Sequence, residues 1–169
     1  YIKKNNYNKI IINSLGILYL NIKDFKKLDN LIDKYIEKEE NYFLFYLKSK
    51  FYENKLIIDK QIYFLIKNIN TNKNFWLAYE TLFNLYEKTN QVENFYNLIT
   101  KTKIIFGNDI KFKYYYALSL YRKNQFQSSL HVLKSEKIEN NFSKLNNKSY
   151  LINLYDLFSK IYLNINKNA

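Results

Sequence analysis

The feature that most constrains the fold is a 34-residue spacing between short polar breaks in a helical sequence pattern. Two breaks of the same kind, Thr89–Val92 and Lys123–Phe126, lie 34 residues apart, and Phe83 and Ala117 repeat at the same distance. A unit of this length with two helices cannot bury its apolar face alone, so neighbouring units must stack. The spacing therefore predicts an array of helical hairpins, each in contact mainly with its neighbours.

The apolar residues between the breaks recur at helical intervals. Tyr79, Leu82, Phe83 and Tyr86 follow the spacing i, i+3, i+4, i+7 of an amphipathic helix. The chain has no proline, so Asn and Asp, which favour turns and helix N-caps, do most of the breaking. These signals predict helices over 6–21, 25–39, 42–53, 58–69, 74–88, 91–105, 109–123, 126–136 and 147–165.

The composition supplies a core and excludes several classes of protein. Hydrophobic residues make up 47% of the 169 residues and aromatic residues 19%, which is not a disordered composition. The absence of cysteine excludes disulfides and thiolate metal sites. The longest apolar run, Ile10 to Leu20, is interrupted by polar residues and is too short to span a bilayer.

The chain is strongly basic, with a formal net charge of +12. Such a balance often indicates a nucleic acid or an anionic surface as partner. However, Arg122 is the only arginine among the 27 basic residues, and the abundant Lys, Asn, Ile, Tyr and Phe are those of AT-rich codons. Proteins that recognise nucleic acid favour arginine for its bidentate geometry. We therefore expect any nucleic-acid binding to be weak and non-specific.

A two-helix unit of about 34 residues resembles the tetratricopeptide repeat. The residue pattern of that repeat is matched by Leu15-Gly16, Tyr19 and Asp24-Phe25. It is matched again by Tyr116-Ala117, Leu120 and Asn124-Gln125-Phe126. The resemblance implies an all-α fold, a right-handed α-solenoid of about four antiparallel hairpins plus one unpaired C-terminal helix. It implies a single repeat domain over 1–169, with units at 6–40, 41–73, 74–108 and 109–138 and a partial unit at 147–169.

Gly16 stands inside a predicted helix, where glycine costs roughly 1 kcal/mol relative to alanine. In the repeat that the chain resembles, small residues lie where the two antiparallel helices cross closely. We therefore expect Gly16 to mark such a crossing, with Ala117 and Ser159 at the equivalent places in later units.

Few residues could carry catalysis or hold a metal or cofactor. His131 is the only histidine and has no second ligand at helical spacing. Gly107-Asn108-Asp109 is explained as a helix stop followed by an N-cap. The cluster of Glu37, Glu39 and Glu40 is interpreted as a solvated helix end. We expect no catalytic residue, no metal and no cofactor.

The resemblance also implies a concave groove lined by the first helix of each unit. Carried over residue by residue, the partner-binding positions are Glu80, Asn84, Glu87, Lys88, Lys111, Tyr114, Tyr121, Arg122, Asp156 and Lys160. Asn, Tyr and Arg side chains suit an extended peptide or a helix, because they can bond to its backbone and add aromatic contact. Acidic residues interrupt the positive charge, which argues against capture of a C-terminal carboxylate.

The sequence thus predicts a scaffold that binds a peptide or protein domain through this groove. One alternative is a non-catalytic repeat region attached to an enzyme domain, as in bacterial sulfotransferase-like proteins that carry such repeats. A second alternative is a basic polyanion-binding repeat. We expect a cytoplasmic location and no membrane span. Because the chain opens at Tyr1 and closes on Asn166–Ala169, we expect a piece of a longer protein, from which a signal peptide can have been lost.

Overall fold

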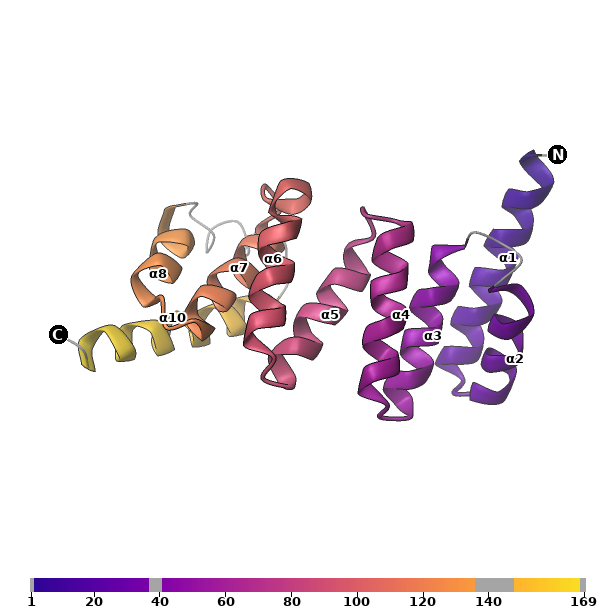
Figure 1. Ribbon diagram of the computed structural model, residues 1–169, viewed down its shortest axis with the longest axis horizontal. Helices are drawn as coiled ribbons and strands as arrows, with labels where there is room; N and C mark the ends of the chain where they lie inside the picture. The colour runs from indigo at the N-terminus through magenta and orange to yellow at the C-terminus, as the bar shows by residue number, and fades with distance from the viewer. Residues whose placement is uncertain (1, 37–40, 136–147, 168–169) are drawn as a thin grey trace. The chain divides into compact units, whose positions relative to one another are not determined.

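The computed structural model describes residues 2–36, 41–135 and 148–167, and all of its regular structure there is helical (Figure 1). The all-α prediction is therefore confirmed. The helices are α1 (Ile2–Asn21), α2 (Phe25–Tyr35), α3 (Tyr42–Asn54), α4 (Ile58–Thr71), α5 (Trp76–Lys88), α6 (Val92–Phe106), α7 (Ile110–Arg122), α8 (Phe126–Ser135) and α10 (Lys148–Lys167). None of these is long and apolar enough to cross a membrane.

The turn that joins the two helices of a hairpin has the same backbone geometry in all four hairpins. One residue in each turn adopts the left-handed conformation: Lys23 (φ 57°), Leu56 (φ 58°), Asn90 (φ 55°) and Asn124 (φ 59°). In each case the next N–H donates to the carbonyl five residues earlier, as in the Asp24 to Tyr19 bond of 2.9 Å and the Gln125 to Leu120 bond of 2.9 Å. This pair of features defines a Schellman C-cap, which satisfies carbonyls left free at a helix end.

The sequence breaks therefore have a common physical cause. The left-handed residues are separated by 33 or 34 positions, which is the period of the sequence pattern. Asn tolerates this conformation better than other residues with a Cβ, which explains Asn90 and Asn124. At the N-terminal side of α2, Asp24 also caps the helix by accepting from the Lys27 N–H at 3.1 Å. The N-cap expected near Gly107 is Asp109, which accepts from the N–H groups of Lys111 and Phe112.

The chain divides into two compact units, Tyr1–Leu82 and Phe83–Ala169, with the boundary inside α5. Each unit is described by itself below. The assignment of one repeat domain to residues 1–169 stays a prediction. The acidic cluster at Glu37, Glu39 and Glu40 lies outside the described residues.

The core of the first unit is formed between α1, α2 and α3. The buried residues of this cluster are Ile12, Leu28, Ile32, Leu44, Leu47 and Phe51. Gly16 is buried at the same place, and a Cβ added there would overlap the Cδ1 atom of Leu47 on α3 and lie 3.7 Å from Leu31 on α2. The expected close crossing is present, but its tightest contact is with the next hairpin rather than with the partner helix α2.

A buried lysine joins α2 to α3. The Lys48 ammonium lies 2.5 Å from Asp29 and 2.7 Å from Asp33, and its side chain is only 8% exposed. Burial disfavours the charge, but the hydrogen bonds to the two carboxylates outweigh it, so the pKa of Lys48 is raised above its ordinary value. This ion triad connects the two helices within the first unit.

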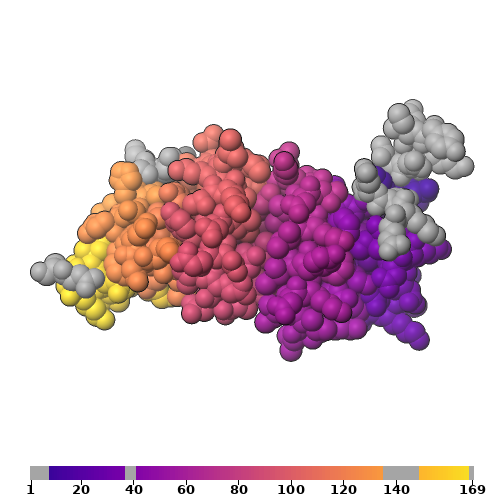
Figure 2. All heavy atoms as spheres, viewed as in Figure 1, coloured from indigo at the N-terminus to yellow at the C-terminus, as the bar shows by residue number. Residues whose placement is uncertain are grey.

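The second unit is built around aromatic and aliphatic contacts between α5, α6, α7, α8 and α10, and Figure 2 shows its side chains forming a continuous surface from rose to yellow. The Phe83 ring lies 5.9 Å from Phe95 and 5.2 Å from Tyr115. Ala117 is fully buried, and the Ser129 hydroxyl donates to its carbonyl at 2.7 Å. A small residue thus lets α8 approach α7, as expected. Ser159 does not share this role, because it is exposed on α10.

Candidate functional site

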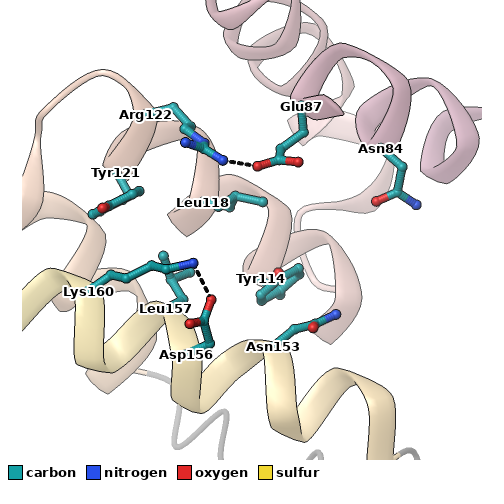
Figure 3. A pocket seen from close by; sticks show the side chains of 10 residues that line it. All are labelled: Asn84, Glu87, Tyr114, Leu118, Tyr121, Arg122, Asn153, Asp156, Leu157 and Lys160. Atoms are coloured by element: carbon teal, nitrogen blue, oxygen red, sulfur yellow. Dashed lines mark hydrogen bonds and ion pairs between the residues drawn. The ribbon is translucent and has the colours of Figure 1, made fainter. Parts of the chain in front are cut away.

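A polar cavity of about 270 Å³ opens in the second unit (Figure 3). Its walls come from three helices: the last turns of α5, one face of α7 and one face of α10. The residues that line it are Asn84, Glu87, Tyr114, Leu118, Tyr121, Arg122, Asn153, Asp156, Leu157 and Lys160. These are the first helices of successive repeats, so the cavity lies where the resemblance implies a groove.

Helical spacing explains why each helix contributes several residues to one wall. Tyr114, Leu118 and Tyr121 stand at i, i+4 and i+7 on α7, and Asn153, Asp156, Leu157 and Lys160 stand at i, i+3, i+4 and i+7 on α10. Residues at these intervals share one face of a helix. Beside this face, α10 is held by the buried residues Leu154 and Ile161. The core contacts therefore decide which face of α10 meets the cavity.

Two ion pairs lie in the cavity walls. Arg122 on α7 binds Glu87 on α5, which joins two helices that are distant in sequence. On α10, the Lys160 ammonium lies 2.5 Å from the Asp156 carboxylate, one helical turn away. The four groups carry two positive and two negative formal charges, so the basic character of the whole chain is absent from this cavity.

Tyr114 forms the buried part of the cavity wall. Its side chain is only 7% exposed, and its ring makes edge contacts with Tyr115 at 5.2 Å and Tyr150 at 5.8 Å between centroids. Burial, followed by the neighbouring Tyr115, Glu87 and Asp156, raises its pKa far above the usual tyrosine value, although Arg122 opposes the shift. The hydroxyl therefore stays protonated and can both donate and accept a hydrogen bond.

Amide and hydroxyl groups complete the polar lining. The Asn84 carbonyl oxygen accepts from the Tyr115 hydroxyl at 3.0 Å, which orients the amide. The Tyr121 hydroxyl accepts from the Asn164 amide at 3.4 Å, so its own proton is available for another acceptor. Within residues 2–36, 41–135 and 148–167, no group of three or more His, Cys, Asp or Glu side chains could hold a metal ion.

Seven of the ten predicted groove residues line this cavity: Asn84, Glu87, Tyr114, Tyr121, Arg122, Asp156 and Lys160. The other three do not. Glu80 is half-buried in the first unit, Lys88 is exposed at the end of α5, and the Lys111 ammonium lies 5.4 Å from the Tyr150 ring centroid. Leu118, Asn153 and Leu157 also line the cavity but are absent from the predicted set, although their helical spacing from Tyr114, Asp156 and Lys160 could have indicated them. Partner binding by these residues stays a prediction.

The structure defines a class of protein: an all-α chain with a tetratricopeptide-like helical repeat fold. No family model and no curated protein sequence matches the chain. Among solved structures, the chain is similar to one titled "MamA RS-1 ArsTM double mutant". The TM-score is 0.60 at 10% sequence identity, and the match covers 95% of this chain and 96% of the other. At that identity the similarity shows the fold alone.

Proposed function

We propose that the chain is a non-catalytic scaffold that binds an extended protein segment in the cavity between α5, α7 and α10. The observation that supports this most directly is the convergence of amides, hydroxyls and ion pairs from three first helices on one cavity. A tetratricopeptide-like fold generally binds proteins or peptides, and this surface offers both donors and acceptors to a peptide backbone.

The polarity of the cavity favours a peptide over an apolar ligand. Leu118 and Leu157 are the only apolar side chains among its ten lining residues. An extended segment brings its own unpaired N–H and C=O groups, which must find partners when they are buried. Asn84, Tyr121 and Asn153 all line the cavity and can supply such partners.

The test replaces Tyr121 and Arg122 together by alanine and measures capture of protein partners from the lysate of the source organism. Partners are identified by mass spectrometry and then purified, and their binding is remeasured directly. We expect the double variant to lose this binding at about 150 mM salt, because both side chains line the cavity. An unchanged affinity for the purified partner would refute the proposal.

The matched control replaces Tyr96 and Lys123 by alanine. This pair lies in the same unit, with the Lys123 ammonium 5.7 Å from the Tyr96 ring centroid, and neither residue lines the cavity. The control removes one tyrosine and one positive charge, as the test variant does. Equal loss of binding in both variants would point to charge or stability rather than to the cavity.

A second candidate function is polyanion binding, which the net charge of +12 favours. Such binding rests on counterion release, so log affinity should fall linearly with log salt concentration. Filter binding of DNA, run beside the capture assay, separates the two functions. If nucleic acid alone is recovered at about 150 mM salt, or if the cavity variant loses both activities together, polyanion binding is the better explanation.

A further inference from the structure

The two hairpin turns of the first unit expose aliphatic side chains where the equivalent turns of the second unit are polar. In the α3–α4 turn, residues 56–58 are all exposed, and Leu56 is exposed by 86%. In the α1–α2 turn, Ile22 is 58% exposed. The positions equivalent to Leu56 in the second unit hold Asn90 and Asn124. The turns therefore share a backbone geometry but differ in the side chains that they present.

Leu56 also holds a backbone conformation that suits leucine poorly. Its φ of 58° lies in the left-handed region, which a Cβ disfavours and which Asn reaches more readily through local hydrogen bonds. Packing of the leucine side chain does not offset this cost, because most of the side chain is exposed. Strained residues of this kind cluster at binding sites and switch regions. The strain is thus a second indication that the Leu56 side chain acts at the surface.

The two turns lie at the same end of the first unit, the lower end in Figure 1. Their hairpins share one core, formed by residues of α1, α2 and α3, so the turns are neighbours along this end. Together they form the turn edge of the first unit. Its exposed aliphatic and lysine residues are Ile22, Lys23, Lys26, Lys55, Leu56, Ile57, Ile58 and Lys60.

Positive charge surrounds the aliphatic side chains of the turn edge, because all of its lysines are exposed. Residues 21–27 and 53–60 also contain acidic side chains, but Asp24 pairs with Lys27 and Glu53 pairs with Lys50. Asp59 is the remaining acidic residue of these two segments. The turn edge therefore complements a surface that is negatively charged outside and apolar beneath.

The backbone donors of both turns are already paired within the chain. The N–H groups of residues 55–57 donate to carbonyls of the last turn of α3, at 3.1 to 3.3 Å. In the α1–α2 turn, the Ile22 N–H donates to the Leu18 carbonyl at 3.0 Å. Donors that are paired internally lose no hydrogen bond when water is removed. The turn edge can therefore enter an apolar environment without leaving these N–H groups unsatisfied.

We propose that the turn edge binds the surface of an anionic lipid bilayer. Leu56 and Ile22 enter the boundary between the headgroups and the acyl chains, and the lysines lie at the lipid phosphates. The inference goes beyond the proposed peptide binding, because the turn edge belongs to the first unit and the cavity to the second.

An anionic bilayer fits the turn edge better than a nucleic acid or a protein does. The phosphates of a nucleic acid bind lysines but leave the aliphatic side chains in water. A protein needs a complementary apolar pocket for each protruding side chain, since stable protein interfaces are closely packed. A fluid bilayer adapts to protruding side chains and presents phosphates around them, so it uses both features of this surface.

The test mixes the 169-residue chain with lipid vesicles and separates the bound protein by flotation. One set of vesicles contains phosphatidylglycerol and phosphatidylcholine in equal amounts, and the other contains phosphatidylcholine only. At about 150 mM salt, we expect binding to the anionic vesicles to be tighter by about tenfold or more, since each lysine near an anionic surface contributes about fivefold.

Substitutions connect this binding to the turn edge. Leu56→Asn should weaken binding to anionic vesicles about tenfold, because it removes an exposed aliphatic side chain. Asn tolerates the left-handed conformation, so the melting temperature of this variant should be unchanged or higher. Lys23→Asn combined with Lys26→Gln should weaken binding about fivefold per lysine. The matched control is Ile104→Asn, because Ile104 is 93% exposed beside the exposed Lys103 in the second unit, and it should leave the affinity unchanged.

Insertion is measured at a single labelled residue. The chain contains no cysteine, so Leu56→Cys provides one site for a fluorophore whose emission depends on polarity. On anionic vesicles, its emission should shift to shorter wavelength and should be quenched by lipids that carry a spin label in the acyl chain. Ile104→Cys with the same fluorophore should show neither change.

Three results would overturn the inference. If the chain does not bind anionic vesicles, or the fluorophore at position 56 stays in water, the turn edge is not a lipid-binding surface. If Leu56→Asn binds the vesicles as tightly as the unaltered chain, the net charge alone explains the binding. If the vesicles do not bind but Leu56→Asn abolishes capture of a partner protein, the occupant of the turn edge is a protein.

Discussion

Substitution of Gly16 tests the close approach between α1 and α3. Alanine at this position should gain about 1 kcal/mol of helix propensity. The new Cβ, however, would overlap Leu47 Cδ1, and Leu47 is 1% exposed in the core of the first unit. Turning Leu47 away from its preferred rotamer costs about 0.5–1.5 kcal/mol. The two effects nearly cancel, so we expect Gly16→Ala to change the free energy of unfolding by less than about 1 kcal/mol.

Leucine at position 16 should behave differently. Its extra atoms must enter the space between Leu47 and Leu31, whose Cδ2 atom is only 3.7 Å from the position of the added Cβ. Overpacking of this kind costs typically 1–3 kcal/mol. Ser14→Leu is the control, since Ser14 is exposed on the same helix. Urea unfolding followed by circular dichroism gives the free energies, and amide exchange of α1 and α3 localises the change to the first unit.

A double-mutant cycle with Leu47→Ala isolates the contact. Leu47→Ala alone should cost about 2–5 kcal/mol, because it leaves a cavity in a buried cluster. In the double variant, the Cβ introduced by Gly16→Ala no longer meets the Leu47 side chain, so the gain in helix propensity is kept. The cost of the double variant should therefore be smaller than the sum of the two single costs by about 0.5–3 kcal/mol. If Gly16→Ala alone stabilises by the full 1 kcal/mol, or the cycle shows no coupling, the close approach does not constrain this residue.

Two further predictions concern a turn and the effect of pH. Leu56 has φ 58° and is 86% exposed, so Leu56→Gly should stabilise the chain by about 1 kcal/mol in urea unfolding. Asn90→Gly at the equivalent turn is the control and should change the free energy of unfolding by only a few tenths of a kcal/mol. A neutral Leu56→Gly would contradict the role assigned to backbone strain. Burial raises the pKa of Tyr79, Tyr86 and Tyr114, so their contribution to stability is complete below the ordinary tyrosine pKa of 10.0 and is lost as the pH rises through the folded values. Tyr114→Phe cannot ionise and should move the alkaline unfolding midpoint, measured by circular dichroism and tyrosinate absorbance, to higher pH; an unchanged midpoint would exclude Tyr114 from the transition.

Local sequence signals predicted the helices and their period. Polar breaks at Lys123–Phe126 and Thr89–Val92 locate turns because few residues tolerate the left-handed conformation that a Schellman cap requires, and Asn is one of them. Such signals are local, so they survive without knowledge of the rest of the chain. The resemblance to the tetratricopeptide repeat also pointed to seven residues that line the cavity.

Which helix faces meet, and which charges pair, could not be predicted from local signals. Nothing local distinguishes Lys48, buried between Asp29 and Asp33, from the many exposed lysines of this chain. The same holds for the Glu87–Arg122 pair, which joins residues 35 positions apart, and for the exposure of Ser159 at a position expected to be small and buried. Pairing and burial depend on how helices dock, and docking is set by the summed packing of many side chains that are distant in sequence.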